Sequence, residues 1–217
     1  MTPGLLADMK KRARLIRAYH VFDAPEARRA EAAGAHVLIV CDLVGPSRLG
    51  YDSVFPVTLS EILHHLKAVK RAAKRALLVA GMPFLSYEID PKEALKNAGV
   101  LVKEGGAQAV KIEGGIEVGG AVKELVRANI PVMGHLGLTP HSRNRLGIAG
   151  RRLGTEKREA ERLLTEARVI EGAGAFAMVL ERVAPAAAAE ISKSLSIAVL
   201  GNDSGARADG VVTVLEK

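Results

Sequence analysis

The sequence predicts a closed (β/α)₈ barrel, and three observations lead to this fold class. First, the 217-residue chain alternates short apolar runs with longer stretches of helical character, which is typical of parallel strands joined by helical crossovers. Second, several runs are apolar throughout, as expected for strands buried on both faces. Third, there are about eight runs, which favours a closed barrel over an open sheet, near the short end of the length range of such barrels.

The eight apolar runs give the expected strands in chain order. Because helical crossovers connect them, we expect all eight strands to run parallel. The expected strands are Leu15–Tyr19, His36–Cys41, Leu77–Ala80, Ala109–Ile112, Val132–His135, Phe176–Leu180, Ile197–Leu200 and Val211–Leu215.

The helices between the strands have recognisable ends. Ser60 is expected to cap a helix that runs to about Lys74. Asp90, Pro91 and Glu93 supply an N-cap acceptor, a proline at the first helical position and an acid at the third, which is a strong helix start. The expected helices are Pro25–Ala33, Ser60–Lys74, Asp90 to about Gly105, Val118–Ala128, Thr155–Glu171 and Pro185–Ser194.

The outer layer of this barrel is expected to be incomplete. The connection Gly201–Gly210 is too short and too rich in Gly and Asp for a full helix, and only Glu216 and Lys217 follow Leu215. We therefore expect one barrel domain over residues 1–217 that lacks its last helix. Such a barrel leaves apolar surface for another copy to cover, which predicts a homo-oligomer.

Composition excludes several classes of protein. The longest apolar stretches have five to six residues, against the roughly 20 needed to span a bilayer, and no signal peptide fits the start. The single cysteine, Cys41, excludes an intrachain disulfide framework and a cysteine-based zinc cluster. We therefore expect a soluble, cytoplasmic protein that does not bind membranes.

The charge balance is basic, with 31 Lys and Arg against 24 Asp and Glu and a net charge of +7. The basic residues are spread along the chain, and with no Trp, three Tyr and four Phe there is little to stack bases on. This favours solvated helix faces and a pocket for an anionic small molecule over nucleic-acid binding.

Candidate site residues stand just after the strands, where the chemistry of this fold collects. Several carboxylates, one lysine and one histidine are expected to converge there, and hard oxygen ligands of this kind suit Mg²⁺. Each residue could instead have a purely structural role. Asp42 could cap a turn, Lys111 and Glu113 could form an ion pair along one strand, His135 could be a polar core histidine, and Glu181 could be an acid at a helix start. His64, His65 and His141 are expected to be solvated. The candidates are Asp42, Lys111, Glu113, His135 and Glu181.

Five stretches, taken together and in order, resemble the ketopantoate hydroxymethyltransferase family. The resemblance implies a barrel of the phosphoenolpyruvate mutase and isocitrate lyase type, assembled into a homo-oligomer. It implies transfer of a one-carbon unit from methylenetetrahydrofolate to an α-keto acid, 3-methyl-2-oxobutanoate, giving 2-dehydropantoate for pantothenate synthesis. The stretches are Gly50–Ser53 with Pro56–Leu59, Met82–Phe84, Val110–Gly115, Pro131–Pro140 and Ala173–Glu181.

The resemblance also implies roles for four residues. Asp42 matches a Mg²⁺ ligand and substrate-site residue, and Lys111 matches the lysine that binds the substrate. Glu113 matches the acid at the metal site, and Glu181 the general base. These roles agree with the chemistry, because a metal-bound α-keto acid forms an enolate more readily, a carboxylate can remove the proton, and a lysine stabilises the developing charge.

The chain departs from the family pattern at two neighbouring places. Cys41-Asp42-Leu43 stands where the family reads Gly-Asp-Ser, and Gly81 replaces a second metal-binding aspartate. The metal then loses one ligand unless water, Asp23 or Asp203 substitutes, so we expect weakened Mg²⁺ binding. The departures keep two alternatives open: a diverged barrel that acts on another α-keto acid by aldol or lyase chemistry, and an inactive paralogue with a binding or assembly role.

Overall fold

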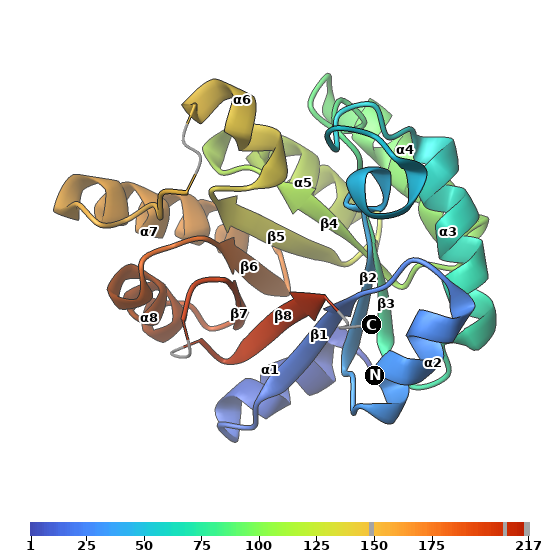
Figure 1. Ribbon diagram of the computed structural model, residues 1–217. Helices are drawn as coiled ribbons and strands as arrows, with labels where there is room; N and C mark the ends of the chain where they lie inside the picture. The colour runs from blue at the N-terminus through green and yellow to red at the C-terminus, as the bar shows by residue number, and fades with distance from the viewer. Residues whose placement is uncertain (148–149, 206–207, 215–217) are drawn as a thin grey trace.

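Eight parallel strands close into a barrel in which each strand pairs with its neighbours in the chain and β8 pairs with β1. The structure is a computed structural model that describes residues 1–147, 150–205 and 208–214. Figure 1 shows the strands at the centre with helices around them. The strands are β1 (Ile16–His20), β2 (Val37–Val40), β3 (Leu77–Gly81), β4 (Ala109–Glu113), β5 (Val132–Gly137), β6 (Ala177–Glu181), β7 (Ala198–Asn202) and β8 (Gly210–Val214).

All eight expected strands are present, and their described ends lie within two residues of the expected ones, so the prediction of a (β/α)₈ barrel is confirmed. The expected end of the last strand at Leu215 lies outside the described residues. The apolar runs form strands because both faces are buried: one packs into the barrel and the other against the helices.

Side chains alternate along each strand between these two faces. On β4, Val110 and Ile112 belong to the layer under the helices, whereas Ala109 lies in the barrel interior. Continuing the alternation places Lys111 and Glu113 inside the barrel, at the carboxyl end of the strand. The barrel interior therefore changes from apolar side chains to charged ones along its axis.

Six helices surround the barrel at or near the expected positions. Asp90 Oδ1 caps α4 as expected, accepting hydrogen bonds from the backbone N–H groups of Lys92 and Glu93 at 2.7 and 3.0 Å. The cap of α3 is Thr58 and not Ser60, because Glu61 lies three residues after Thr58 and completes a capping box. The helices are α2 (Ala24–Ala32), α3 (Leu59–Ala72), α4 (Pro91–Lys103), α5 (Gly119–Arg127), α7 (Lys157–Gly172) and α8 (Pro185–Ser194).

One helix that the sequence pattern did not indicate, α1 (Pro3–Lys11), lies at the amino-terminal end of the barrel. Its Leu6 and Met9 are buried with the lower side chains of the barrel interior. Short helical turns also occupy the loops at the opposite end: η1 (Gly45–Leu49), η2 (Ile116–Val118), η3 (Pro140–Ser142) and α6 (Arg143–Leu146). The barrel is therefore closed at the end where α1 lies, and the site residues lie at the other end.

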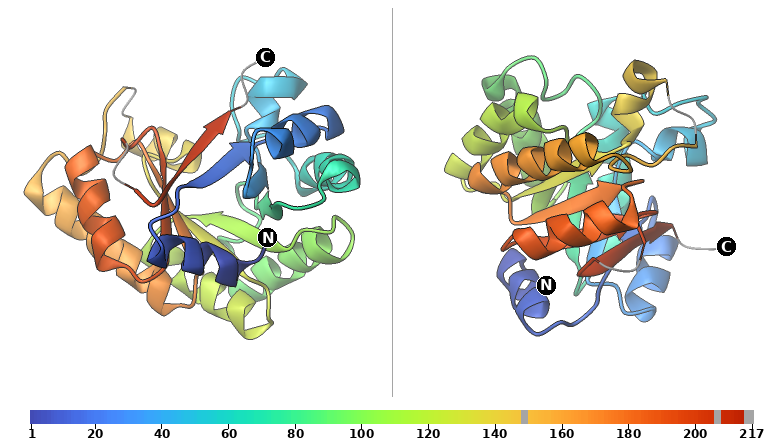
Figure 2. Two further views of the ribbon diagram at one scale, coloured as in Figure 1. Left: turned by 90° about the horizontal axis from the view of Figure 1, so that it is seen from below. Right: turned by 90° about the vertical axis from the view of Figure 1, so that its left-hand side faces the viewer.

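The connection between β7 and β8 contains no helix in its described residues, 203–205 and 208–209, as expected. The outward side chains of β1 and β8 are only partly covered: Tyr19 and Val211 are half-buried, and Arg17 and Thr213 are exposed. Figure 2 shows these two strands with no helix outside them in the part of the chain that the structure describes. The expectation about residues after Leu215 falls outside the described residues. None of the described helices is long and apolar enough to cross a membrane.

Candidate active site

The carboxyl end of the barrel holds a layer of buried polar side chains that continue the inward-facing positions of the strands. His20, Lys111, Glu113, His135 and Glu181 are each 3–7% exposed. Polar groups buried to this degree need a partner in the protein or a bound ligand, because removing a polar group from water without a new hydrogen bond costs free energy. Their pairing therefore defines what this end of the barrel can do.

Lys111 and Glu113 form a buried ion pair on β4. Lys111 Nζ donates to Glu113 Oε1 at 3.0 Å, and both side chains are almost fully buried. Burial is the largest single effect and lowers the pKa of Lys111, but Glu113 and the other nearby acidic groups together raise it by more, so the pKa of the ammonium lies above its ordinary value. Burial likewise raises the pKa of Glu113, and Lys111 is the largest of the effects that bring it well below its ordinary value. The pair is therefore ionised at neutral pH.

His135 on β5 connects this pair to Glu181 on β6. Lys111 Nζ lies 3.0 Å from His135 Nδ1, and His135 Nε2 lies 3.1 Å from Glu181 Oε2. If the ammonium donates to Nδ1, the imidazole carries its proton on Nε2, which faces the carboxylate. Burial and Lys111 lower the pKa of His135, whereas the carboxylates of Glu113 and Glu181 raise it and prevail.

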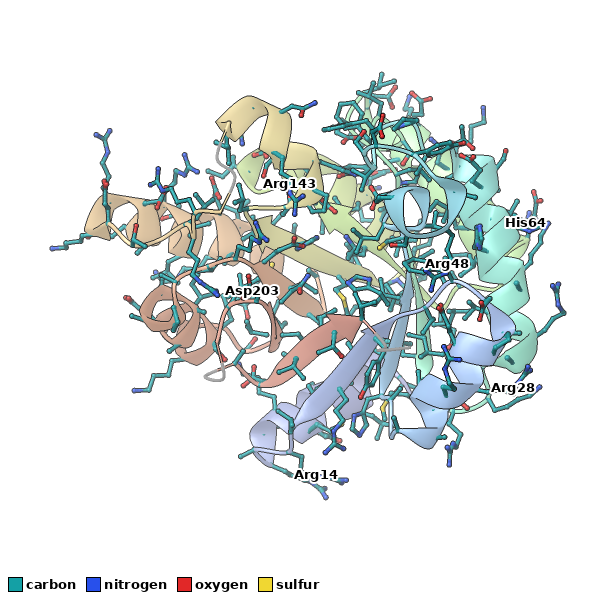
Figure 3. The ribbon with its side chains drawn as sticks, in the orientation of Figure 1. Arg14, Arg28, Arg48, His64, Arg143 and Asp203 are labelled. Carbon is teal, nitrogen blue, oxygen red and sulfur yellow. The ribbon has the colours of Figure 1, made fainter. Side chains whose placement is uncertain are left out.

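Glu181 ends β6 at the edge of the barrel mouth. Asn202 Nδ2 donates to Glu181 Oε2 at 3.1 Å. Arg143, at the start of α6, lies over the strand ends (Figure 3), with its guanidinium 4.0 Å from Glu181 Oε1. Burial raises the pKa of Glu181, but the hydrogen bond with His135 and the charge of His135 bring it below its ordinary value. Glu181 is thus a carboxylate at neutral pH, able to accept a proton.

A second cluster joins Asp42, Glu113 and His141. One donor atom from each lies within 4.8 Å of the other two, and His141 Nε2 lies 2.5 Å from Asp42 Oδ2. The expectation that His141 is solvated is wrong: its side chain is 7% exposed, because the loop after β5 folds over the barrel mouth. Burial lowers the pKa of His141, but Glu113 and Asp42 raise it by more.

The remaining histidines behave differently from one another. His64 is exposed on the outer side of α3, as expected (Figure 3). His65 is half-buried, with Nδ1 2.7 Å from the carbonyl oxygen of Phe22, so the expectation of a solvated residue does not hold for it. His20 Nδ1 lies 3.4 Å from Cys41 Sγ, and its Nε2 has no partner among the described residues. Burial and then Lys111 lower the pKa of His20 to about 3, so it is neutral.

Gly81 and Cys41 face each other where β3 and β2 end. A Cβ atom added to Gly81 would lie 2.5 Å from Cys41 Cβ and 3.4 Å from Lys111 Cε. The position that carries an aspartate in the family pattern therefore has no room for a side chain while residue 41 is a cysteine. Burial is the largest effect on the Cys41 thiol and raises its pKa. The thiol is therefore protonated, as expected for a small apolar strand residue.

A cavity of about 800 Å³ opens beside these groups. Glu113, His135 and His141 form part of its wall. Aromatic side chains line one part of it, with the rings of Phe55 and Phe84 in an edge-to-face contact at 4.9 Å. Its outer part is lined by residues of α6 and α7, including Arg145, Arg162 and Glu166. The cavity is large enough for a drug-sized ligand.

The structure brings Asp42, Lys111, Glu113, His135 and Glu181 to one end of the barrel. It does not bring Asp23 or Asp203 to this cluster. Asp23 caps α2 by accepting from the backbone N–H of Glu26 at 2.7 Å, and Asp203 forms an ion pair with Arg152 at 2.6 Å. Sequence reasoning missed Tyr87, which is buried against His141 and Glu113.

The donor set fits a divalent cation. Asp42 and Glu113 offer two carboxylate oxygens, and His141 offers an imidazole nitrogen at a distance that one ion can bridge. Among the residues that the structure describes, no arginine pairs with either carboxylate, and the Lys111 ammonium pairs with the other oxygen of Glu113, Oε1. No oxygen donor comes from β3, because residue 81 is glycine.

Two solved structures are similar to this chain in fold. A phosphoenolpyruvate phosphomutase from Streptomyces platensis superposes with a TM-score of 0.72 at 16% identity, covering 99% of this chain and 81% of that one. A 2,3-dimethylmalate lyase, a member of the phosphoenolpyruvate mutase and isocitrate lyase superfamily, gives 0.66 at 16% identity, covering 97% and 80%. At such low identities these structures establish the fold alone, which is the expected (β/α)₈ barrel.

The sequence comparisons identify the family. The family model described as ketopantoate hydroxymethyltransferase matches residues 1–217. A 3-methyl-2-oxobutanoate hydroxymethyltransferase from Carboxydothermus hydrogenoformans is 50% identical over 217 residues, covering 99% of this chain and 77% of the relative. One from Dehalococcoides mccartyi is 44% identical, covering 99% and 76%. The chain belongs to the ketopantoate hydroxymethyltransferase family of enzymes, as the resemblance predicted.

Proposed function

We propose that this protein transfers a hydroxymethyl group from methylenetetrahydrofolate to 3-methyl-2-oxobutanoate, giving 2-dehydropantoate for pantothenate biosynthesis. The observation that carries the proposal is the row of buried groups in contact from Lys111 through His135 to Glu181. The protein that carries them is 50% identical to a 3-methyl-2-oxobutanoate hydroxymethyltransferase. This row places the Lys111 ammonium, which can bind an α-keto acid, and the Glu181 carboxylate, which can act as a base, at the same barrel mouth.

Glu181 is proposed as the base that removes the proton from C3 of the keto acid. Its lowered pKa keeps it ionised at neutral pH, and it lies at the end of β6 beside His135, which forms part of the cavity wall. His135 Nε2 lies 3.1 Å away, outside hydrogen-bond geometry but close enough for its ring to stabilise the charge of the carboxylate.

Lys111 is proposed to bind the carboxylate of the keto acid and the negative charge that develops on its oxygen during enolisation. Its ammonium is fixed between Glu113 and His135 by 3.0 Å contacts, so no reorientation is needed as the charge appears. When bound, a divalent cation held by Asp42 and Glu113 would polarise the keto oxygen as a Lewis acid. The family resemblance implies Mg²⁺ here, and the glycine at position 81 implies a weakened Mg²⁺ site.

The 800 Å³ cavity is the proposed place for methylenetetrahydrofolate. It adjoins Glu113 and His135, and Phe55 and Phe84 give it an aromatic wall on which a flat ring system packs. Arg145 and Arg162 at its outer part suit the carboxylates of a folate. The cosubstrate would thus reach the enolate carbon from the cavity side, while the keto acid occupies the barrel mouth.

Hydrogen exchange at C3 tests the proposal without the folate. The protein is incubated with 3-methyl-2-oxobutanoate in deuterated buffer with added Mg²⁺ or Mn²⁺, and loss of the C3 proton signal is followed by NMR. Glu181→Gln is expected to abolish the enzyme-dependent exchange while the circular dichroism spectrum is unchanged. Glu190→Gln, an exposed acid on α8, is the matched control and should exchange like the wild type. Undiminished exchange in a folded Glu181→Gln protein would exclude this base.

A second candidate function follows from the Cys41 and Gly81 pair, which changes the barrel mouth relative to the family pattern. Another α-keto acid would undergo the same proton removal with the same lysine and base. Exchange measured over a panel of α-keto acids separates the two, because the diverged enzyme would exchange a different member faster. Absence of exchange with every member would favour an inactive paralogue.

A further inference from the structure

We propose that Asp42, Glu113 and His141 form a binding site for a divalent transition metal such as Co²⁺, Mn²⁺ or Zn²⁺, with His141 Nε2 as a direct ligand, and that this site selects against Mg²⁺. The proposal deepens the function given above, on which its catalytic meaning rests, by naming the class of metal that the same barrel mouth takes.

The first step is that β3 cannot supply an oxygen ligand. Gly81 has no side chain, and Cys41 occupies the space into which one would grow, with Cβ atoms that would lie 2.5 Å apart. Among the described residues, the three-residue group of Asp42, Glu113 and His141 is the one whose ligand atoms lie close enough together to share an ion. The third protein ligand is therefore a nitrogen.

The second step is that the loop after β5 places His141 firmly. The backbone N–H of His141 donates to Glu113 Oε2 at 3.2 Å, and its Nε2 reaches Asp42 Oδ2 at 2.5 Å. The imidazole ring lies against the rings of Phe84 and Tyr87, with centroid distances of 5.5 and 6.2 Å. Its position between two carboxylates is thus fixed by the backbone and by packing.

The third step concerns the proton on the ring. Tyr87 Oη lies 3.0 Å from His141 Nδ1 and 3.0 Å from the carbonyl oxygen of Glu113. Tyr87 has one hydrogen, and a carbonyl can only accept, so the phenol donates to Glu113 and its oxygen accepts from Nδ1–H. A metal-binding histidine characteristically donates its other ring N–H to an oxygen, which fixes the tautomer. Nε2 is then the ring atom that faces Asp42 and Glu113, and a bound cation would take the place of the hydrogen that Nε2 shares with Asp42.

The fourth step is the preference of the donor set. Mg²⁺ binds oxygen ligands, whereas imidazole together with carboxylates suits the first-row transition metals. Three protein ligands also leave coordination positions open for the two oxygens of an α-keto acid. The donor set therefore favours a transition metal over Mg²⁺ before any substrate is bound.

Calorimetric titration of the metal-free protein with Co²⁺, Zn²⁺ and Mg²⁺ alone, without substrate, tests this proposal. We expect Co²⁺ and Zn²⁺ to bind at least about tenfold more tightly than Mg²⁺. His141→Gln, which keeps a polar side chain beside Asp42, should weaken Co²⁺ binding by at least about tenfold while changing Mg²⁺ binding by less than about twofold. His64→Gln, at an exposed histidine on α3, is the matched control and should leave both unchanged.

Proton NMR of the Co²⁺ form gives a second measurement. A ligating His141 predicts a strongly shifted imidazole N–H signal, retained in His64→Gln and absent in His141→Gln. Tyr87→Phe removes the acceptor for Nδ1–H and should weaken Co²⁺ binding by about tenfold. Equal affinity for Mg²⁺ and Co²⁺, or Co²⁺ binding that His141→Gln leaves intact, would overturn the proposal. The metal titrations contain no substrate, so their outcome does not depend on whether the protein catalyses C3 exchange. The role of Glu181 is in turn tested by the exchange experiment and does not depend on metal selectivity.

Discussion

Residue 41 and residue 81 share one small volume between β2 and β3. Because a Cβ at position 81 would meet Cys41 Cβ at 2.5 Å, a side chain at one position requires glycine at the other. The family pattern places glycine first and aspartate second, and this chain has the side chain first and glycine second. The side chain at position 41 and the glycine at position 81 are therefore linked by this shared volume, whereas Leu43 at the serine position of the family pattern is a separate departure.

The shared volume of residues 41 and 81 predicts non-additive effects of substitution. Gly81→Asp should lower the free energy of unfolding by about 1–3 kcal/mol, the usual cost of overpacking a buried position, and adding Cys41→Gly should restore a large part of it. Urea unfolding of both single variants and the double variant measures the coupling. Gly99→Asp on α4, where no atom lies within 4 Å of an added Cβ, is the matched control. Costs that simply add would show that residues 41 and 81 do not compete for space.

Lys111 is the partner that keeps Glu113 ionised. In Lys111→Met, burial raises the pKa of Glu113 above that of the unfolded chain, so folding takes up a proton. We expect the variant to be about 3–5 kcal/mol less stable than the wild type at pH 8, as for other buried pairs that lose one member. The difference should shrink between pH 8 and pH 5, because Glu113 is neutralised in the variant over this range while the wild type keeps its ion pair. Urea unfolding at pH 8 and pH 5 checks this, and a difference that grows on acidification would contradict it.

The positions of the acids and the lysine could be predicted from the sequence, because strand ends are readable and residues two apart on a strand face the same way. The burial of His141 could not. Its nearest strand ends at Gly137, and nothing in a stretch that contains Pro140 and Ser142 shows that the loop turns back over the barrel mouth. That turn depends on contacts with Tyr87 and Asp42, which come from distant parts of the sequence.

At the scale of the element, one buried acid ties a helix to a strand. Glu31, near the end of α2, accepts hydrogen bonds through Oε1 from the backbone N–H groups of Lys74, Arg75 and Ala76 at 2.7–2.9 Å. These groups precede β3, and their position in the chain would otherwise leave them unpaired. Burial raises the pKa of Glu31, but the three N–H donors outweigh it and the pKa lies below its ordinary value of 4.5.

Glu31→Gln is therefore expected to lower the free energy of unfolding at pH 7 by about 2 kcal/mol, the usual worth of hydrogen bonds to a charged group. Because the folded pKa is below the unfolded one, this contribution is present above about pH 4.5 and is lost as the pH falls through the folded pKa. Thermal or urea unfolding from pH 7 to pH 3 should show the two proteins converging. Glu104→Gln, an exposed acid after α4, should match the wild type throughout.

Elements with a continuous apolar run or an unambiguous cap were predicted well, and α4 with its Asp90 cap is the best example. The Ser60 cap was wrong because Thr58 lies at the correct spacing from Glu61 to form a reciprocal pair. Helix α1 was missed because its nine residues bury only Leu6 and Met9, too few to give a recognisable apolar stripe. Its helical state depends on the barrel floor against which it packs.

At the scale of the whole molecule, the outward face of β1 and β8 is the thinnest part of the wall. Leu15, which precedes β1, is 50% exposed, and Val211 on β8 is half-buried. We therefore expect a homo-oligomer with this sector at or near an interface. Sedimentation equilibrium at micromolar concentration should give a multiple of 22.9 kDa. Leu15→Lys should lower the mass, whereas Val169→Lys, at a partly exposed position on α7, should not. A stable monomer would contradict the expectation.

The closure of the barrel has a consequence for synthesis of the chain. Ile16 pairs with Gly210 and His20 pairs with Val214, so one edge of β1 stays open until residues 210–214 have left the ribosome. During that time the nascent sheet has two unpaired edges, and its apolar inner face is accessible to other chains. Contacts so distant in sequence also form slowly. The same β1–β8 pairing that closes the finished barrel therefore leaves the growing chain open to aggregation until its last strand has been made.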